Sequence, residues 1–268
     1  MIILGISDSH EAHACIVKNG ELVSAVAEER ITRLKADMGY PRKSIDTVLA
    51  LENLSPGDID VVAFAGKRGT PFHALYKINA LFSIKDWIKQ CYEYWGPILI
   101  DGKKMSQWDD FEIFKKIRGD DLYKDPYYDF VRKSFQKKNI DLHKIFNEVR
   151  SETVQKHLGI NNEKIKFYRH EDCHKLFGLY SYPGDLNEAT IITLEGGGDD
   201  SSATFSSYKD DKIKEIWSSN LVNLGRLYRY VTLILGMKPA QHEYKVMGLA
   251  PYGNKYHGQF SLDFFNSL

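Results

Sequence analysis

The residues with the clearest potential for chemistry are two histidines four positions apart, His170 and His174. Side chains at this spacing lie on one face of an α-helix, and imidazole is a common ligand for transition metals. A third ligand is expected from Glu195, which ends an apolar run and enters a glycine-rich stretch. Two imidazoles and one carboxylate with open positions suit iron(II), zinc or manganese. The sequence therefore predicts a metal centre at these three residues.

Three glycines, Gly196, Gly197 and Gly198, follow the predicted acidic ligand directly. Because glycine has no side chain, the backbone amides of such a loop can approach an anion closely. We expect a phosphate pocket beside the metal. The histidine pair also has a plainer interpretation, as a structural pair, which spacing alone leaves open.

The same segment fits a second class of enzyme. His170, Glu171 and His174 match the His-Glu-x-x-His signature of zinc peptidases, in which the glutamate is the general base. However, the residues before His170 are typical of a strand, and Glu195 ends a β-branched run instead of lying on a helix. A peptidase is therefore the weaker alternative.

Composition excludes several classes of protein. The chain has 268 residues, with 36 basic and 36 acidic side chains, so its net charge is zero. A neutral chain argues against a general nucleic-acid or membrane-surface binder. Three widely spaced cysteines suit a reducing compartment. No leader and no membrane-spanning run is recognisable, and we expect a cytoplasmic protein.

The first 66 residues predict a unit that would position further reactive side chains. Apolar runs at 2–6, 12–17 and 22–27 are typical of strands, and Asn-Gly at positions 19 and 20 predicts a hairpin. A helix is expected from Pro41, followed by a strand at 59–65. The polar loop after the first strand carries Asp8 and His10 as candidate catalytic residues, although ordinary turn chemistry would also explain it.

A charged segment follows the third predicted strand. Arg30, Arg33 and Lys35 could face an anionic ligand, or they could form a solvated surface with weak ion pairs. The next segment, 67–164, mixes aromatic and charged residues and predicts a helical insertion with an aromatic core.

The opening pattern returns in the last segment, 165–268. A short strand at 165–168 leads into the histidine helix, whose core face is predicted to carry Cys173, Leu176, Phe177 and Tyr180. Strands are then expected at 189–194, 202–208 and 213–217, followed by a helix marked by Leu224, Leu227, Tyr228, Val231 and Leu235. The unit β-β-β-α thus occurs twice, and each copy begins with a strand that ends in an acid.

This order predicts an α/β fold of the actin-like ATPase type, in which two ribonuclease-H-like halves enclose a nucleotide. The two acids, Asp8 and Glu195, would then face each other across a cleft. The second half lacks room for its closing strands, so we expect it to be incomplete.

Four motifs resemble the NodU/CmcH/TobZ carbamoyltransferase family, specifically the amino-terminal part of its Kae1-like domain. They lie at residues 5–30, at the His-x-x-x-His of 170–174, at the acid-glycine loop of 195–198, and at 244–253, with sequence YKVMGLAPYG. The last of these is the most specific.

The resemblance implies an O-carbamoyltransferase. Carbamoyl phosphate and ATP would form a carbamoyl adenylate, whose carbamoyl group passes to a hydroxyl of a small-molecule or glycan acceptor. By resemblance, His170, His174 and Glu195 would bind iron(II), and magnesium could accompany the nucleotide. His10 would act as a base or polarising group, while the glycines and Lys245 would hold the phosphate. A nucleotide-binding module without catalysis is the alternative within this fold.

The chain departs from the family pattern in two respects. The family usually has aspartate where Glu195 stands, and small residues where Lys175, Leu176 and Phe177 stand. Family members are also longer. The remainder of the Kae1-like domain and a YrdC-like domain, which makes the adenylate, would lie beyond Leu268, so we expect a fragment or one part of a split system.

Overall fold

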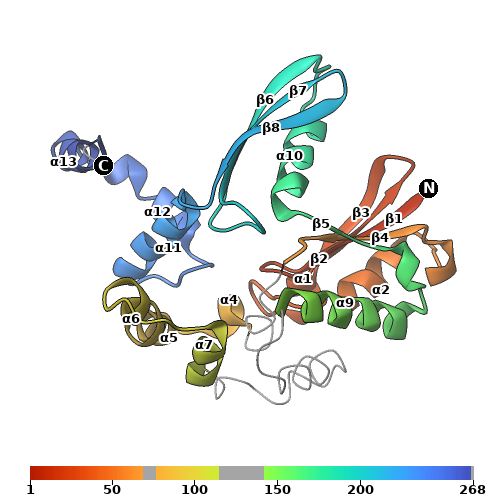
Figure 1. Cartoon of the computed structure of the whole chain (residues 1–268), viewed down its shortest axis with the longest axis horizontal. Helices are drawn as coiled ribbons and strands as arrows, with labels where there is room; N and C mark the ends of the chain where they lie inside the picture. Colours follow the sequence, from red (N-terminus) through yellow and green to blue (C-terminus); the bar gives the residue numbers. More distant parts are fainter. Residues whose placement is uncertain (69–76, 115–141, 267–268) are drawn as a thin grey trace.

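The computed structural model describes residues 1–68, 77–114 and 142–266. These residues form a mixed α/β structure with one five-stranded sheet and one three-stranded sheet (Figure 1). Two parts of the predicted helical insertion, 69–76 and 115–141, lie outside the described residues.

The five-stranded sheet is built on the amino-terminal hairpins, in the order β3-β2-β1-β4-β5. The first three strands run antiparallel, whereas β4 and β5 are parallel to β1. Asn19 and Gly20 both have positive φ, as the predicted hairpin turn requires. The strands of this sheet are β1 (Ile2–Ser7), β2 (His13–Lys18), β3 (Glu21–Ala27), β4 (Val61–Ala65) and β5 (Ile165–Tyr168).

One face of this sheet forms the main core. The predicted helix after Pro41 is confirmed as α2 (Arg42–Leu51), and its Ile45, Val48 and Leu49 are buried with β-strand residues such as Leu4 and Phe64. The short helices α1 (Glu28–Thr32) and 3-10 helix η1 (Pro56–Asp58) flank α2. Figure 1 shows α2 and α9 (Leu142–Leu158) below the strands.

The described part of the segment between β4 and β5 contains several helices joined by irregular stretches such as 100–106. Phe82, Trp87 and Phe114 give it buried aromatic packing, with ring centroids of Phe82 and Phe114 4.6 Å apart. Its elements, besides α9, are α4 (Ile78–Leu81), α5 (Ile84–Gln90), the π-helix η2 (Cys91–Trp95), α6 (Gly96–Leu99), α7 (Gln107–Phe114) and the 3-10 helix η4 (Asn162–Lys164).

The histidine helix, α10 (His170–Tyr180), connects the two sheets (Figure 1). Its predicted core face is wrong: Phe177 and Tyr180 are 73% and 80% exposed, whereas Glu171 and Lys175 are buried. The helix packs on β6, and its two buried charged side chains have partners outside the helix: Lys175 pairs with Glu215, and Glu171 Oε1 accepts a hydrogen bond from the amide of Ser201.

The second sheet has the expected antiparallel order β6-β7-β8. Its strands are β6 (Glu188–Leu194), β7 (Ala203–Lys209) and β8 (Lys212–Ser219). The predicted helix follows as α11 (Leu224–Ile234), and the chain continues through α12 (Glu243–Met247), 3-10 helix η5 (Ala250–Tyr252) and α13 (Lys255–Asn266). Within the described ranges, every helix is too short or too polar to cross a membrane.

Candidate functional site

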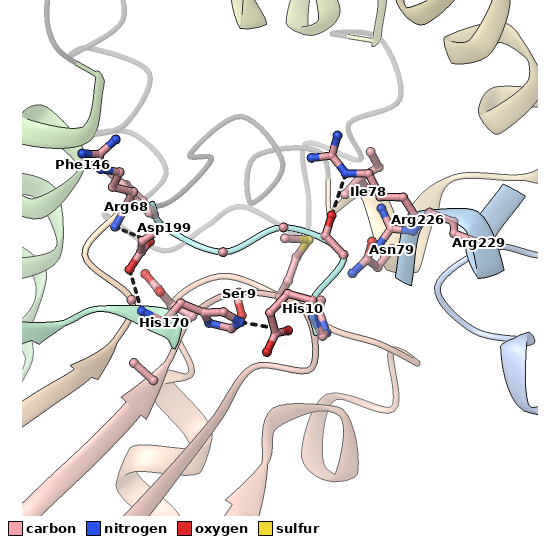
Figure 2. A pocket seen from close by; sticks show the side chains of 18 of the residues that line it. Ser9, His10, Arg68, Ile78, Asn79, Phe146, His170, Asp199, Arg226 and Arg229 are labelled. Carbon is pink, nitrogen blue, oxygen red and sulfur yellow. Dashed lines mark hydrogen bonds and ion pairs between the residues drawn. The ribbon is translucent and has the colours of Figure 1, made fainter. Parts of the chain in front are cut away.

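A cavity of about 320 Å³ lies where the loops after β1, β4 and β6 meet helices α10 and α11 (Figure 2). Pockets of this size can hold small ligands. Its wall includes most of the residues that the sequence singles out, and it is lined by Asp8, Ser9, His10, Met38, Ala65, Gly66, Arg68, Ile78, Asn79, Phe146, Arg150, His170, Glu195, Gly196, Gly197, Gly198, Asp199, Arg226 and Arg229.

The three predicted metal ligands come together at the edge of this cavity, which His170 and Glu195 line. The Nε2 atoms of His170 and His174 are 3.0 Å apart, and the Glu195 oxygens lie 3.7 Å from the former and 3.4 Å from the latter. Ligand bonds of about 2.0–2.2 Å separate neighbouring ligand atoms by about 2.9–3.5 Å. The donor atoms therefore fit a transition-metal ion, with nitrogen and oxygen ligands from three side chains.

The acid and the two imidazoles perturb each other. The hydrogen bond with Glu195 raises the pKa of His170, whereas burial lowers the pKa of His174. The pKa of Glu195 is lowered, mainly by its hydrogen bond with His170. The carboxylate is thus ionised near neutral pH, as a metal ligand must be.

Asp199, at the end of the glycine loop, fixes the start of the histidine helix. Its carboxylate accepts hydrogen bonds from the backbone amides of His170, at 2.7 Å, Lys67, at 2.7 Å, and Arg68, at 2.8 Å. A carboxylate at a helix N-terminus satisfies an amide that lacks a helical partner and favours the helix dipole. The sequence analysis missed this residue, because only the folded chain brings the three amides to it.

Glu171, on the histidine helix, accepts hydrogen bonds from amides that follow the glycine loop. It is fully buried, and its Oε1 accepts hydrogen bonds from the amides of Asp200 and Ser201, both at 2.6 Å. Burial opposes ionisation of Glu171, but these hydrogen bonds outweigh it and its pKa is lowered. A peptidase base must reach a substrate water. This glutamate is enclosed and engaged by the loop, so the geometry does not favour the peptidase alternative.

Charged residues attach α10 to the second sheet. Lys175 Nζ lies 2.7 Å from Glu215 on β8 and 3.2 Å from Asp172. Arg169, just before the helix, lies 3.2 Å from Asp200. These contacts explain why a lysine can occupy a buried position on the helix.

The loop after β1 brings His10 to the cavity. The backbone of His10 forms an isolated bridge with Met38, and Gly39 donates to the carbonyl of Asp8 at 3.1 Å. Desolvation by the surrounding cavity wall lowers the pKa of His10, although the residue is exposed at the cavity mouth, and the charges of both His170 and Glu195 act on it. His10 therefore shares one electrostatic environment with the predicted metal ligands.

Asp8 lines the cavity but is committed to an ion pair. Its two oxygens accept from Nε and Nη2 of Arg150, each at 2.7 Å, and both side chains are 3% exposed. The geometry gives Asp8 a positioning role for the loop that carries His10. Its predicted catalytic role would require this pair to open.

Two predicted phosphate contacts are not among the described residues that line the cavity. Lys245 lies on α12, with Nζ 5.9 Å from the ring centroid of Tyr244. The exposed Arg30 has Glu29 as a neighbour, 3.9 Å away. Both assignments stay predictions. The cations that do line the cavity include Arg226 and Arg229, which the sequence analysis did not single out because it assigned their helix to packing.

The fold and site define an α/β protein with a His-His-carboxylate cluster beside a glycine loop. Residues 2–262 match the family described as carbamoyltransferase N-terminus, and the chain belongs to that family.

The chain is also similar to parts of longer curated proteins. It is 27% identical over 254 residues to an uncharacterized protein of Methanocaldococcus jannaschii, covering 94% of this chain and 33% of that protein. An uncharacterized protein of Synechocystis is 25% identical over 266 residues, covering 97% and 36%. The nodulation protein NolNO of Sinorhizobium fredii is 25% identical over 246 residues, covering 91% and 28%. The chain thus spans about a third of the length of these relatives.

Proposed function

We propose that this chain is the amino-terminal part of an O-carbamoyltransferase of the NodU/CmcH/TobZ type. The carbamoyl group of carbamoyl adenylate, made from carbamoyl phosphate and ATP, passes to a hydroxyl of a small-molecule or glycan acceptor. One observation carries this proposal: in a chain of the carbamoyltransferase N-terminus family, a single cavity is lined by His10, by the glycine loop and by two members of the His-His-Glu cluster, His170 and Glu195, and His174 lies beside them.

The side chains of His170, His174 and Glu195 would hold iron(II), with zinc or manganese as alternatives. When bound, such an ion supplies a Lewis acid that stabilises the oxyanion of carbamoyl transfer. The support for this part of the proposal is the convergence of the three ligand atoms, which lie within 4.8 Å of one another.

In this proposal, His10 is the general base. Because its pKa is lowered by desolvation, the neutral imidazole predominates near pH 7. It accepts the acceptor's hydroxyl proton as the hydroxyl oxygen forms a bond to the carbamoyl carbon. The bond from that carbon to the phosphate oxygen breaks, and AMP leaves with the electron pair.

We also propose that the two β-β-β-α units belong to an actin-like ATPase fold that the rest of a Kae1-like domain completes. A YrdC-like domain, in a longer chain or a separate subunit, makes the adenylate. Two features support this arrangement: both units follow the same order of strands and helix, and the curated relatives are about three times as long.

Metal analysis tests the proposed ligands. We expect near-stoichiometric iron or zinc in protein purified without added metal, and its loss in His174→Ala. His13→Ala is the matched control, because His13 lies on β2, with Nδ1 2.7 Å from the carbonyl oxygen of Glu11, and does not line this cavity. Equal metal content in both variants would contradict the ligand assignment.

A transfer assay tests the reaction. Carbamoyl adenylate is generated in situ by a separate YrdC-type enzyme, and carbamoylated products are detected by mass spectrometry across a panel of hydroxyl acceptors. We expect His10→Asn to lower the rate by about 10²–10⁴-fold, the usual contribution of a general base, and His13→Asn to leave it unchanged. Binding of adenylate by the unaltered protein without transfer to any acceptor would favour the non-catalytic module.

A further inference from the structure

Of the four arginines at the cavity, two have an acidic partner among the described residues and two have none there. Arg68 Nη2 lies 2.8 Å from Asp200, and Arg150 is paired with Asp8. The other two form no ion pair with a carboxylate in the described part of the chain. The arginines that line the cavity wall are Arg68, Arg150, Arg226 and Arg229.

Arg226 and Arg229 are placed by one helix and held by aromatic rings. They lie three residues apart on α11, so both can face the cavity. The guanidinium of Arg226 is 5.7 Å from the ring centroid of Trp95, and that of Arg229 is 5.6 Å from the ring centroid of Trp87. Figure 2 shows both arginines beside Asn79, across the cavity from Arg68 and Asp199.

The glycine loop lies directly against this pair. Arg226 Nε donates to the carbonyl of Gly196 at 2.7 Å. A Cβ on Gly225 would lie 2.9 Å from the Cα of Gly196, so only glycine permits this close approach of helix and loop. The amides of Gly196, Gly197 and Gly198 donate to no backbone or side-chain group among the described residues.

The charges at this corner favour an anion. Burial lowers the pKa of Arg229, because a desolvated cation is unfavourable, and the neighbouring positive charge of Arg226 lowers it further, while Glu243 and Tyr230 oppose this shift. The charge of Arg229 also acts on His10, which feels His170 and Glu195 as well. His10 therefore lies within electrostatic reach of both the arginine pair and the predicted metal ligands.

We propose that Arg226 and Arg229, together with the amides of the glycine loop, form a subsite for the phosphoryl group of the carbamoyl donor. The inference rests on the proposed function for the identity of the donor. It deepens that function by replacing the predicted contacts of Lys245 and Arg30 with cations that line the cavity.

The geometry suits a phosphoryl group better than a carboxylate. One guanidinium can satisfy both oxygens of a planar carboxylate through two parallel hydrogen bonds. A phosphoryl group offers three oxygens in different directions, which two guanidinium groups and loop amides can share. Held there, the donor would have its transferable group near His10.

Binding measurements on metal-depleted protein test the subsite without any transfer reaction. Chelation removes the metal, which would itself bind phosphate. Inorganic phosphate, AMP, carbamoyl phosphate and acetate are then titrated by calorimetry and by tryptophan fluorescence. We expect phosphate, AMP and carbamoyl phosphate to compete with one another, and to quench or shift emission from the two tryptophans under the arginines. Loss of the fluorescence change in Trp95→Phe, with binding retained, would locate the site.

Variants give the decisive comparison. Arg226→Gln and Arg229→Gln should each weaken phosphate binding by about 10- to 100-fold, the effect of losing a charge-assisted hydrogen bond. The matched control is Arg42→Gln, because Arg42 stacks on Tyr40 at 5.7 Å but does not line the cavity. Arg229→Lys, which keeps the charge, tests whether bidentate geometry matters, and circular dichroism checks folding.

Unchanged phosphate affinity in the folded double variant would overturn the proposal. The proposal would also be wrong if acetate bound as tightly as phosphate, or if AMP and carbamoyl phosphate failed to compete with phosphate. Arginine-dependent binding of AMP and carbamoyl phosphate in a protein that transfers nothing would support the subsite and refute the proposed function, so the two failures are distinguishable.

Discussion

Removing the buried carboxylate of Asp8 is the strongest test of how the loop that carries His10 is held. Arg150 donates to both oxygens of Asp8, and it also donates to the carbonyl of Gly66 at 3.2 Å and to Oδ1 of Asn147 at 2.9 Å. In Asp8→Ala, the guanidinium would lose its counter-ion while it stays desolvated. We therefore expect that removing this one buried side chain lowers the free energy of unfolding substantially.

The magnitude follows from the burial of the pair. Breaking a buried ion pair by removing one partner costs about 3–5 kcal/mol. For a chain of this size, 1 kcal/mol lowers Tm by about 2–4 °C, so Asp8→Ala should lower Tm by about 6–20 °C. Asp8→Asn should lower Tm less, because the amide oxygen still accepts one hydrogen bond from Arg150.

Urea denaturation followed by circular dichroism measures the change in the free energy of unfolding. The control is Glu93→Ala, which removes an exposed i,i+4 pair with Lys89, 3.8 Å apart, and should cost less than about 1 kcal/mol. Asp8→Ala combined with Arg150→Met should cost less than the sum of the single variants, since no charge is left unpaired. Additive losses, or a loss below about 1 kcal/mol for Asp8→Ala, would refute the reasoning.

Four further predictions concern glycines and titratable groups of α10, β8 and α11. Gly225→Ala should cost about 1–3 kcal/mol in urea denaturation, because its Cβ would lie 2.9 Å from the glycine loop. Gly178→Ala on α10, with open space around it, should be neutral or stabilising. The hydrogen bond from Lys175 lowers the pKa of Glu215 from 4.5. Glu215→Gln should therefore lower the free energy of unfolding above about pH 4.5, and this loss should vanish as pH falls further. A difference in unfolding free energy between the two proteins that stays constant with pH would contradict this. Burial raises the pKa of Cys173 to about 11, and its alkylation by iodoacetamide at pH 8, followed by peptide mass spectrometry, should be much slower than that of a model thiol.

The fold was predictable where the signals are local. Apolar runs and the Asn-Gly turn predict the hairpins, and the four-residue spacing of His170 and His174 predicts one face of a helix. The buried face of α10 was not predictable. Periodicity cannot show whether a buried lysine such as Lys175 will find an acid from a strand forty residues away.

The candidate site was predictable only in part for the same reason. The ligand types of the proposed metal centre follow from sequence motifs, whereas the side chains that we propose to bind an anion are brought to the cavity by the position of α11. Lys245 lies in the most specific motif and does not line the cavity, whereas Arg226 and Arg229 lie on an ordinary amphipathic helix and do. A motif identifies a family more reliably than it identifies the contacts of each residue.

The glycine loop and the histidine helix hold each other through crossed hydrogen bonds. Glu171 of the helix accepts from two amides after the loop, and Asp199 of the loop accepts from the amide of His170. Neither element can shift without breaking a buried, charge-assisted contact with the other. Arg226 adds a third contact by donating to the carbonyl of Gly196. An anion bound to Arg226 would therefore restrain the loop, and through it the orientation of His170, so that ligand binding and the geometry of the metal ligands are expected to be coupled.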